Sequence, residues 1–200
     1  MPRDREATRA RILAATERLI ARHGCGAAGV NAIAKEAGVD KVLLYRYFGG
    51  AGGAVTALAR DRRLWPEIAS RAREEATLAD ALIAALLEEA RELRDRPLTR
   101  AALAGSLAAR TELATHLSAS RDREHESLAS ALRERFRLPL YLDFQALVAL
   151  LSAGLASLSL HADAGTPWLG VDVRTDRGRR RVEKTLDVVA RAVLGGPEDS

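Results

Sequence analysis

Apolar side chains recur every three or four residues along most of the chain, and glycine or proline separates one run from the next. This period is that of an α-helix with one buried face. Alanine and leucine dominate and β-branched residues are few, which favours helix over strand. The sequence therefore predicts an all-α protein, long enough for one or two small domains with a real core.

The first three predicted helices are close together at the N-terminus. One covers residues 4–23 and ends at Gly24; two short helices follow, at 30–37 and 41–48. Gly38 lies between them and tolerates the positive φ of a sharp turn, and Asp40 is a suitable N-cap for the second. Two short helices joined by a glycine turn, with a polar and aromatic outer face, are typical of a helix-turn-helix DNA-binding motif. An ordinary pair of packed helices would give the same apolar pattern.

The wider match favours DNA binding. The residues concerned are Thr8-Arg9, Ile12-Leu13-Ala14-Ala15, Gly24, Ile33-Ala34, Ala37-Gly38-Val39 and Leu44-Tyr45-Arg46-Tyr47-Phe48. Together they resemble the N-terminal domain of tetracycline-repressor (TetR) family regulators. The resemblance covers the first quarter to third of the chain. It implies a helix-turn-helix DNA-binding domain at residues 1–50 and a regulatory domain at 51–200 that binds a ligand and dimerises.

Charge agrees with this assignment. Residues 1–50 hold nine Lys/Arg and five Asp/Glu, whereas the remaining residues hold 22 of each, so the net charge of +4 lies with the predicted DNA-binding domain. We expect the second short helix, with the segment from its N-cap Asp40 to Tyr47, to enter the major groove of double-stranded DNA, with Lys41, Val42 and Leu43 towards base edges. The predicted DNA-binding residues are Arg3, Arg5, Arg9, Asn31, Asp40, Lys41, Val42, Leu43, Tyr45, Arg46 and Tyr47.

Three residues depart from the family pattern. Gly29 stands where a Ser or Thr usually caps the first motif helix, and Val42 takes a position that is usually small. Ala51 replaces a lysine that usually contacts a phosphate. The alternative function is therefore a helical protein-interaction module whose helix-turn-helix is vestigial.

After Phe48 the sequence GGAGGA predicts a loop, and a fourth helix should follow it and end near Trp65-Pro66. Further helices are expected from Thr77 to Pro97, at 99–114, at 115–136, at 141–162 and from Thr175 to Gly195, before an acidic tail that we expect to be disordered. Residues 144–160 carry no charge, but the run is short for a membrane span and contains Gln145 and three serines. We predict a buried helix of a soluble protein and no membrane partner.

The last two helices would leave apolar surface on a monomer. Pairing with a second copy in a four-helix bundle would bury it, although the same residues could instead close the monomer's own core. We predict a homodimer whose interface contains Leu151, Leu155, Leu158, Val182, Leu186, Val189 and Val193.

The resemblance also implies a ligand pocket in the regulatory domain. Residues that could line it are Trp65, Arg110, His116, Phe136, Tyr141, Phe144 and Trp168, although the aromatic ones suit core or loop positions equally well. The lack of charge in the apolar stretches predicts a small hydrophobic effector.

Catalysis and cofactors are not predicted. The four histidines are scattered, Cys25 is the only cysteine, and GGAGGA lacks the lysine of a phosphate-binding loop. Carboxylate pairs such as Glu88-Glu89 are expected on solvated helix faces. The sequence thus predicts a cytoplasmic, ligand-responsive transcriptional regulator. We expect a repressor that binds a pseudo-palindromic operator as a dimer, without metal or cofactor.

Overall fold

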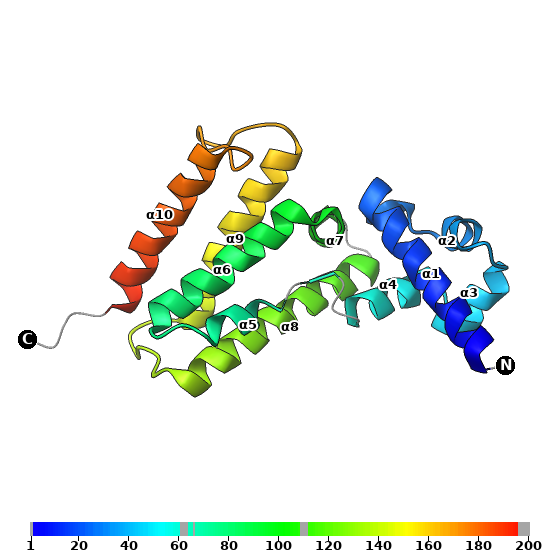
Figure 1. Ribbon diagram of the computed structural model, residues 1–200, viewed down its shortest axis with the longest axis horizontal. Coiled ribbons are helices and arrows are strands. Elements are labelled where there is room, and N and C mark those ends of the chain that lie inside the picture. Colours follow the sequence, from blue (N-terminus) through cyan, green and yellow to red (C-terminus); the bar gives the residue numbers. More distant parts are fainter. Residues whose placement is uncertain (1, 61–63, 66, 109–111, 196–200) are drawn as a thin grey trace, which may run out of the picture. The chain divides into compact units, whose positions relative to one another are not determined.

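The computed structural model describes residues 2–60, 64–65, 67–108 and 112–195. In this part of the chain every regular element is a helix, and the nearest approach to a strand is a pair of backbone hydrogen bonds between Trp168 and Val171. The all-α prediction is confirmed (Figure 1). The predicted acidic tail lies outside the described residues.

The chain divides into two compact units. Unit 1 comprises Met1–Trp65 and Arg96–Asp122, and unit 2 comprises Pro66–Asp95 and Arg123–Ser200. Helix α8 (Glu112–Arg135) contributes its first half to unit 1 and its second half to unit 2. The proposed functional boundary after residue 50 divides unit 1, because α4 and α7 belong to the same compact unit as the first three helices.

Unit 1 is built on α1 (Pro2–His23), which contacts α2 (Val30–Ala37), α4 (Ala51–Arg60) and α7 (Pro97–Ala108). Helix α3 (Lys41–Phe48) packs against α2 and α4. A short 3-10 turn, η1 (Cys25–Ala27), follows α1. Its Cys25 is buried with Sγ 3.4 Å from the carbonyl oxygen of Ala101, and burial raises the thiol pKa to about 11. The thiol is therefore protonated at neutral pH and serves packing.

The turns around α2 and α3 follow the sequence prediction. Gly24 ends α1 with φ 78°, and Gly38 ends α2 in the left-handed region with φ 62°. Asp40 caps α3, because its side chain accepts a hydrogen bond of 2.7 Å from the backbone N–H of Val42.

The predicted GGAGGA loop is wrong for most of its length, since α4 begins at Ala51. Only Gly49 and Gly50 form the turn, with φ of 74° and 126°. Gly53 is needed for packing instead: a Cβ there would lie 1.6 Å from the carbonyl oxygen of Phe48. The glycines predicted a loop, whereas here Gly53 permits the close approach of α4 to the end of α3.

Unit 2 is organised around α6 (Leu78–Asp95), which contacts α5 (Ile68–Ala72), α9 (Phe144–Asp163) and α10 (Asp176–Leu194). Its core contains Leu82, Leu86, Leu128, Leu132, Phe144, Val148, Leu155 and Leu186. The residues predicted to begin two of these helices cap them: Thr77 accepts a hydrogen bond from the N–H of Asp80, and Thr175 accepts one from the N–H of Gly178. Helix α5, which is only five residues long, was not predicted.

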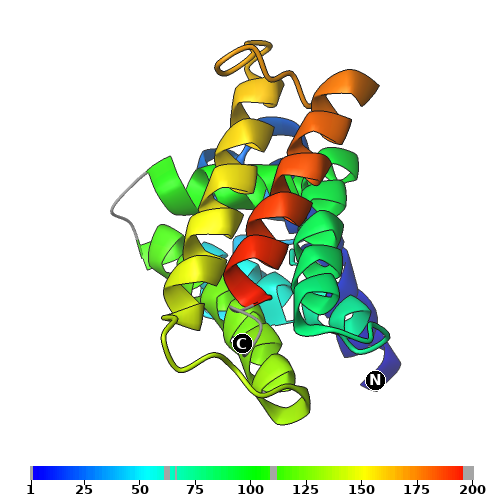
Figure 2. The ribbon, with the colours of Figure 1, turned by 90° about the vertical axis from the view of Figure 1, so that its left-hand side faces the viewer.

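Helix α9 is less buried than predicted. It is long and apolar enough to cross a membrane, a property that core helices of soluble proteins share, and 33% of its apolar window is buried. One face packs into the core through Val148, Ser152 and Leu155. Figure 2 shows α9 and α10 at the front of unit 2, and the other face of α9 is exposed.

Candidate DNA-binding surface and apolar face

Helix α3 presents a polar and aromatic strip to solvent. Lys41 and Arg46 are exposed, and the side chains of Val42 and Tyr45 are 63% and 55% exposed. Leu44 is fully buried and holds the helix against the rest of unit 1. The predicted base-facing set of Lys41, Val42 and Leu43 is brought together only in part, because Leu43 is half-buried and Tyr45 lies on the exposed strip instead.

Two arginines of α1 lie against the end of α3. The guanidinium carbon of Arg5 is 5.9 Å from the centroid of the Tyr47 ring, and that of Arg9 is 5.5 Å from the Phe48 ring. Both distances suit a cation–π contact, which places positive charge beside α3. Asn31 is exposed near the start of α2. The side chain of Arg3 lies outside the described residues.

The orientation of α2 is fixed by an ion pair with α1. Arg18 Nε donates to Glu36 Oε1 at 2.8 Å, and this hydrogen bond lowers the pKa of the Glu36 carboxyl. At the start of α2 no side chain caps the helix, as the glycine at position 29 requires. The motif therefore has one capped helix, α3, and one that lacks a side-chain cap.

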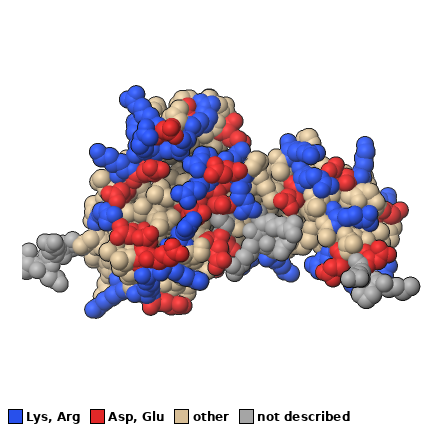
Figure 3. All heavy atoms as spheres, viewed as in Figure 1, with Lys and Arg blue, Asp and Glu red and all other residues tan. Residues whose placement is uncertain are grey.

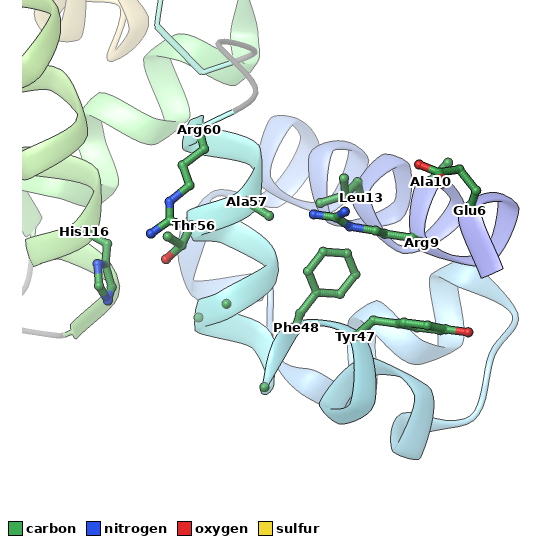
Figure 4. Close-up of a pocket in the computed structure, with 13 residues that line it drawn as sticks. Glu6, Arg9, Ala10, Leu13, Tyr47, Phe48, Thr56, Ala57, Arg60 and His116 are labelled. Atoms are coloured by element: carbon green, nitrogen blue, oxygen red, sulfur yellow. The ribbon is translucent and has the colours of Figure 1, made fainter. Parts of the chain in front are cut away.

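A cleft of about 820 Å³ lies between α1, the end of α3 and α4 (Figure 4). Arg9, Arg60 and His116 line it, and Glu6 is the only carboxylate among the lining residues that the structure describes. Its walls include the small residues Gly49, Gly52, Gly53 and Ala57. The lining also includes Tyr47, and Arg9, Tyr47 and His116 belong to the predicted sites. The cleft itself was not predicted, because it forms only when α1 and α4 pack together.

Unit 2 carries an apolar surface between α9 and α10, in contrast to the charged cleft of unit 1. An apolar groove of about 340 Å³ there is lined by Leu151, Leu155, Leu158, Val182, Leu186 and Val189, six of the seven predicted interface residues. The seventh, Val193, is half-buried, and its carbonyl oxygen accepts a hydrogen bond from Tyr141. Leu155 and Leu186 are buried within unit 2 itself.

The most exposed apolar residues of this face escaped the prediction. Leu150 is 73% exposed, Val188 is 58% exposed, and Ala149, Ala153 and Gly154 continue the exposed face of α9. A Cβ added at Gly154 would meet nothing within 4 Å. Their spacing was readable in the sequence, but the buried side of the same helix is equally apolar, so pattern alone could not separate the two faces.

Ion pairs hold α10 in place beside this groove. Arg191 bonds to Asp80 of α6 at 2.6 Å and to Asp187 at 2.8 Å. Hydrogen bonds from Thr77 and Arg191 lower the pKa of Asp80. At the other end, hydrogen bonds from Arg174 lower the pKa of Asp172 to about 2. Figure 3 shows Lys and Arg gathered over this start of α10, so the apolar groove is bordered by charge.

The predicted ligand-lining residues are not gathered in one place. Trp65 is buried in unit 1, Phe136 and Phe144 pack in the unit 2 core, and Tyr141 is exposed. Trp168 stacks on His161 with ring centroids 4.8 Å apart. Arg110 lies outside the described residues. Of the six that the structure describes, His116 alone lines the cleft or the groove.

A buried polar cluster in unit 2 was missed. His125 Nε2 of α8 lies 3.4 Å from Glu89 Oε2 of α6 and 3.0 Å from Ser152 Oγ of α9. The expectation that Glu89 is solvated is wrong, since the residue is 5% exposed. A signal existed: Glu89 continues the apolar spacing of Leu82, Leu86 and Leu93 in α6. Its partners are far away in sequence and could not be read from it.

Among the described residues, no three His, Cys, Asp or Glu side chains gather in a group that could hold a metal ion.

Comparison with known proteins identifies the N-terminal part. Residues 12–50 match the family model of bacterial regulatory proteins, tetR family. The chain is 34% identical over 119 residues to an uncharacterized HTH-type transcriptional regulator of Mycobacterium tuberculosis, Rv1255c, which covers 55% of this chain and 59% of that protein. It is 48% identical over 50 residues to the HTH-type transcriptional repressor SCO4008 of Streptomyces coelicolor, 25% of this chain and 26% of the repressor. The chain thus spans little more than half of the first relative and about a quarter of the second.

Solved structures share the fold along nearly the whole chain. The fatty acid degradation regulator FadR from Bacillus halodurans has a TM-score of 0.64 and 22% identity, with 94% of this chain and 95% of that one covered. A TetR family transcription regulator from Marinobacter aquaeolei has a TM-score of 0.60 and 18% identity, with 97% and 98% covered. The match at residues 12–50, the two relatives and the shared fold together support a transcription regulator of the TetR type.

Proposed function

We propose that the chain is a ligand-responsive transcriptional repressor that binds a pseudo-palindromic operator as a homodimer. The observation that carries the proposal is the exposed strip of Lys41, Val42, Tyr45 and Arg46 on α3, within a segment that matches the family. A short helix with a basic and aromatic free face, held by a buried leucine, suits insertion into the major groove. The rival, an interaction module with a vestigial motif, would not require basic residues beside that strip.

In this mechanism the two kinds of DNA contact come from different elements. Lys41, Val42 and Tyr45 face base edges, and these contacts choose the sequence. Arg5, Arg9, Asn31 and Tyr47 contact phosphates, and these contacts fix the position of the protein on the duplex. Asp40 acts indirectly, because its carboxylate is engaged in capping α3.

The dimer forms through α9 and α10. The exposed face of α9 carries Leu150 and three small residues, Ala149, Ala153 and Gly154, which allow a second helix to approach closely. A second copy is the natural occupant, since a two-fold symmetric protein presents two readers to two half-sites one helical turn apart. Each apolar face then covers the other.

The effector is a small molecule that is largely hydrophobic and binds in unit 2. The cluster of Glu89, His125 and Ser152 supplies a polar contact inside an otherwise apolar core. Effector binding favours a conformation in which the readers no longer match the half-site spacing, and DNA affinity falls. The protein acts in the cytoplasm, where its DNA is, and performs no catalysis.

The proposal is tested by a mobility-shift assay with the DNA flanking the chain's own gene, using the wild type and a Lys41→Ala/Arg46→Ala double variant. We expect a shift that depends on the sequence of the duplex and is lost in the double variant. A folded double variant that binds as tightly as the wild type would refute DNA reading by α3.

A further inference from the structure

The cleft between α1 and α4 has no role in the proposed function. It lies entirely within unit 1, whereas the effector is expected in unit 2. Its volume of about 820 Å³ falls within the range of small-molecule sites, and one molecule the size of a nucleotide or a sugar phosphate would fit.

Two arginines on different helices supply positive charge to this cleft. Arg9 of α1 and Arg60 of α4 both line it, and within the described part of the chain neither forms an ion pair with a carboxylate. Figure 4 shows the Arg9 guanidinium beside Phe48 and the Arg60 side chain next to Thr56. The Thr56 hydroxyl and the His116 ring add further polar groups to the lining.

The opposing charge is small. Among the described residues, Glu6 is the only carboxylate that lines the cleft, and it is exposed on α1. Guanidinium groups bind phosphate through paired hydrogen bonds, so two of them facing a cleft favour an occupant with more than one negative charge. The small side chains at Gly52, Gly53 and Ala57 leave room for such a group beside α4.

We propose that the α1–α4 cleft binds a phosphorylated small molecule and that this molecule competes with DNA. Arg9 and Tyr47 line the cleft and are also expected to contact the DNA backbone, so an occupant would use groups that DNA needs. The site is thus a second input, separate from the effector in unit 2. The predicted competition with DNA rests on the proposed function, whereas the predicted binding of the phosphorylated molecule does not.

Binding is measured by calorimetry on the full chain at low salt, with inorganic pyrophosphate as the probe. We expect saturable binding of one pyrophosphate per chain, weakened about tenfold or more in Arg60→Gln, the usual effect of losing a charged hydrogen bond. Glu6→Gln removes the opposing charge and should tighten binding a few-fold. The matched control is Arg11→Gln, on α1 but outside the cleft lining, which should bind as the wild type does.

Measurements of operator binding then distinguish whether the cleft holds a free phosphate compound or a phosphate of the DNA backbone. We expect pyrophosphate to weaken operator binding, and Arg60→Gln alone to leave operator affinity and its salt dependence unchanged. Absence of saturable pyrophosphate binding, or equal losses in Arg60→Gln and Arg11→Gln, would overturn the proposal. So would an Arg60→Gln variant with a shallower salt dependence of DNA binding, because the cleft would then hold a DNA phosphate. If the wild type failed to bind DNA while pyrophosphate binding persisted, only the proposed function would fall.

Discussion

The exposed face of α3 and the exposed face of α9 offer different chemistry to a partner. Helix α3 exposes Lys41, Tyr45 and Arg46 to solvent, whereas α9 exposes Leu150 together with small apolar residues such as Ala149. Binding of phosphates and base edges by the α3 face would weaken as the salt concentration rises. Binding of an apolar partner by the α9 face would be driven by removal of apolar surface from water and would depend little on salt. The proposed function therefore assigns one of these surfaces to DNA and the other to a second copy of the chain.

The largest effect is expected where a charge enters the apolar face. Leu150→Glu should weaken dimerisation by about 3 kcal/mol or more, roughly a hundredfold in Kd, because each copy would bury an unpaired carboxylate. Sedimentation velocity over a range of concentrations measures it. Leu140→Glu is the control, since Leu140 is 96% exposed and does not line the groove. A folded Leu150→Glu chain that stayed fully dimeric would remove α9 from the interface. Leu186 is unsuitable for this test, because it is 5% exposed and a charge there would disturb the core.

The next effect concerns the bases read by α3. Lys41→Ala should cost about 1–3 kcal/mol at the preferred site and alter the base preference, because a base contact carries sequence information. Tyr47→Phe should cost about 0.5–1.5 kcal/mol at every site, because it removes one phosphate hydrogen bond. Selection from random duplexes, followed by sequencing, distinguishes the two. An unchanged preference in Lys41→Ala would make Lys41 a phosphate contact.

A smaller effect is expected at the start of α4. Ala51 occupies the first position of the helix, where the backbone N–H groups already favour a phosphate. Ala51→Lys should steepen the slope of log K against log salt by about 0.9 per added phosphate contact, with sequence preference unchanged. A salt titration of operator affinity measures the slope for both proteins. Parallel lines would mean that residue 51 lies away from the DNA.

The smallest effect concerns the uncapped helix of the motif. Gly29→Ser supplies the missing side-chain acceptor at the start of α2 and should stabilise the protein by a few tenths of a kcal/mol, about 0.3. Asp40→Ala, which removes the existing cap of α3, should destabilise it by about 1 kcal/mol. Urea unfolding of both variants gives the two free energies. A Gly29→Ser variant less stable than the wild type would show that position 29 does not accept a capping side chain.

The two faces also differ in how far the sequence revealed them. The boundaries of α2 and α3 depend on Gly38, Asp40 and a few neighbours. Because these interactions are local in sequence, they could be predicted without knowing how the helices pack. The start of α4 was misread because Gly53 is required by a contact with Phe48 rather than by a loop. Apolar spacing predicted six of the residues that line the groove between α9 and α10. It could not distinguish the leucines that are buried inside unit 2 from those that are exposed.

Long-range polar contacts were beyond the sequence. Glu89, His125 and Ser152 come from three helices, and only the position of Glu89 on an apolar stripe hinted at burial. The aromatic residues predicted to line a ligand pocket do not lie together for the same reason: each packs against residues from a different part of the sequence. Side chains that meet across helices can be assigned only when the packing of those helices is known.

The central claim is that unit 1 reads DNA as part of a dimer. The most direct measurement is a fluorescence anisotropy titration of the DNA flanking the chain's own gene, against a scrambled duplex, at two salt concentrations. We predict saturation at two chains per half-site pair, clear preference over the scrambled duplex at both salts, and weaker binding at the higher salt. Equal binding to both duplexes, or none at either salt, would contradict the account.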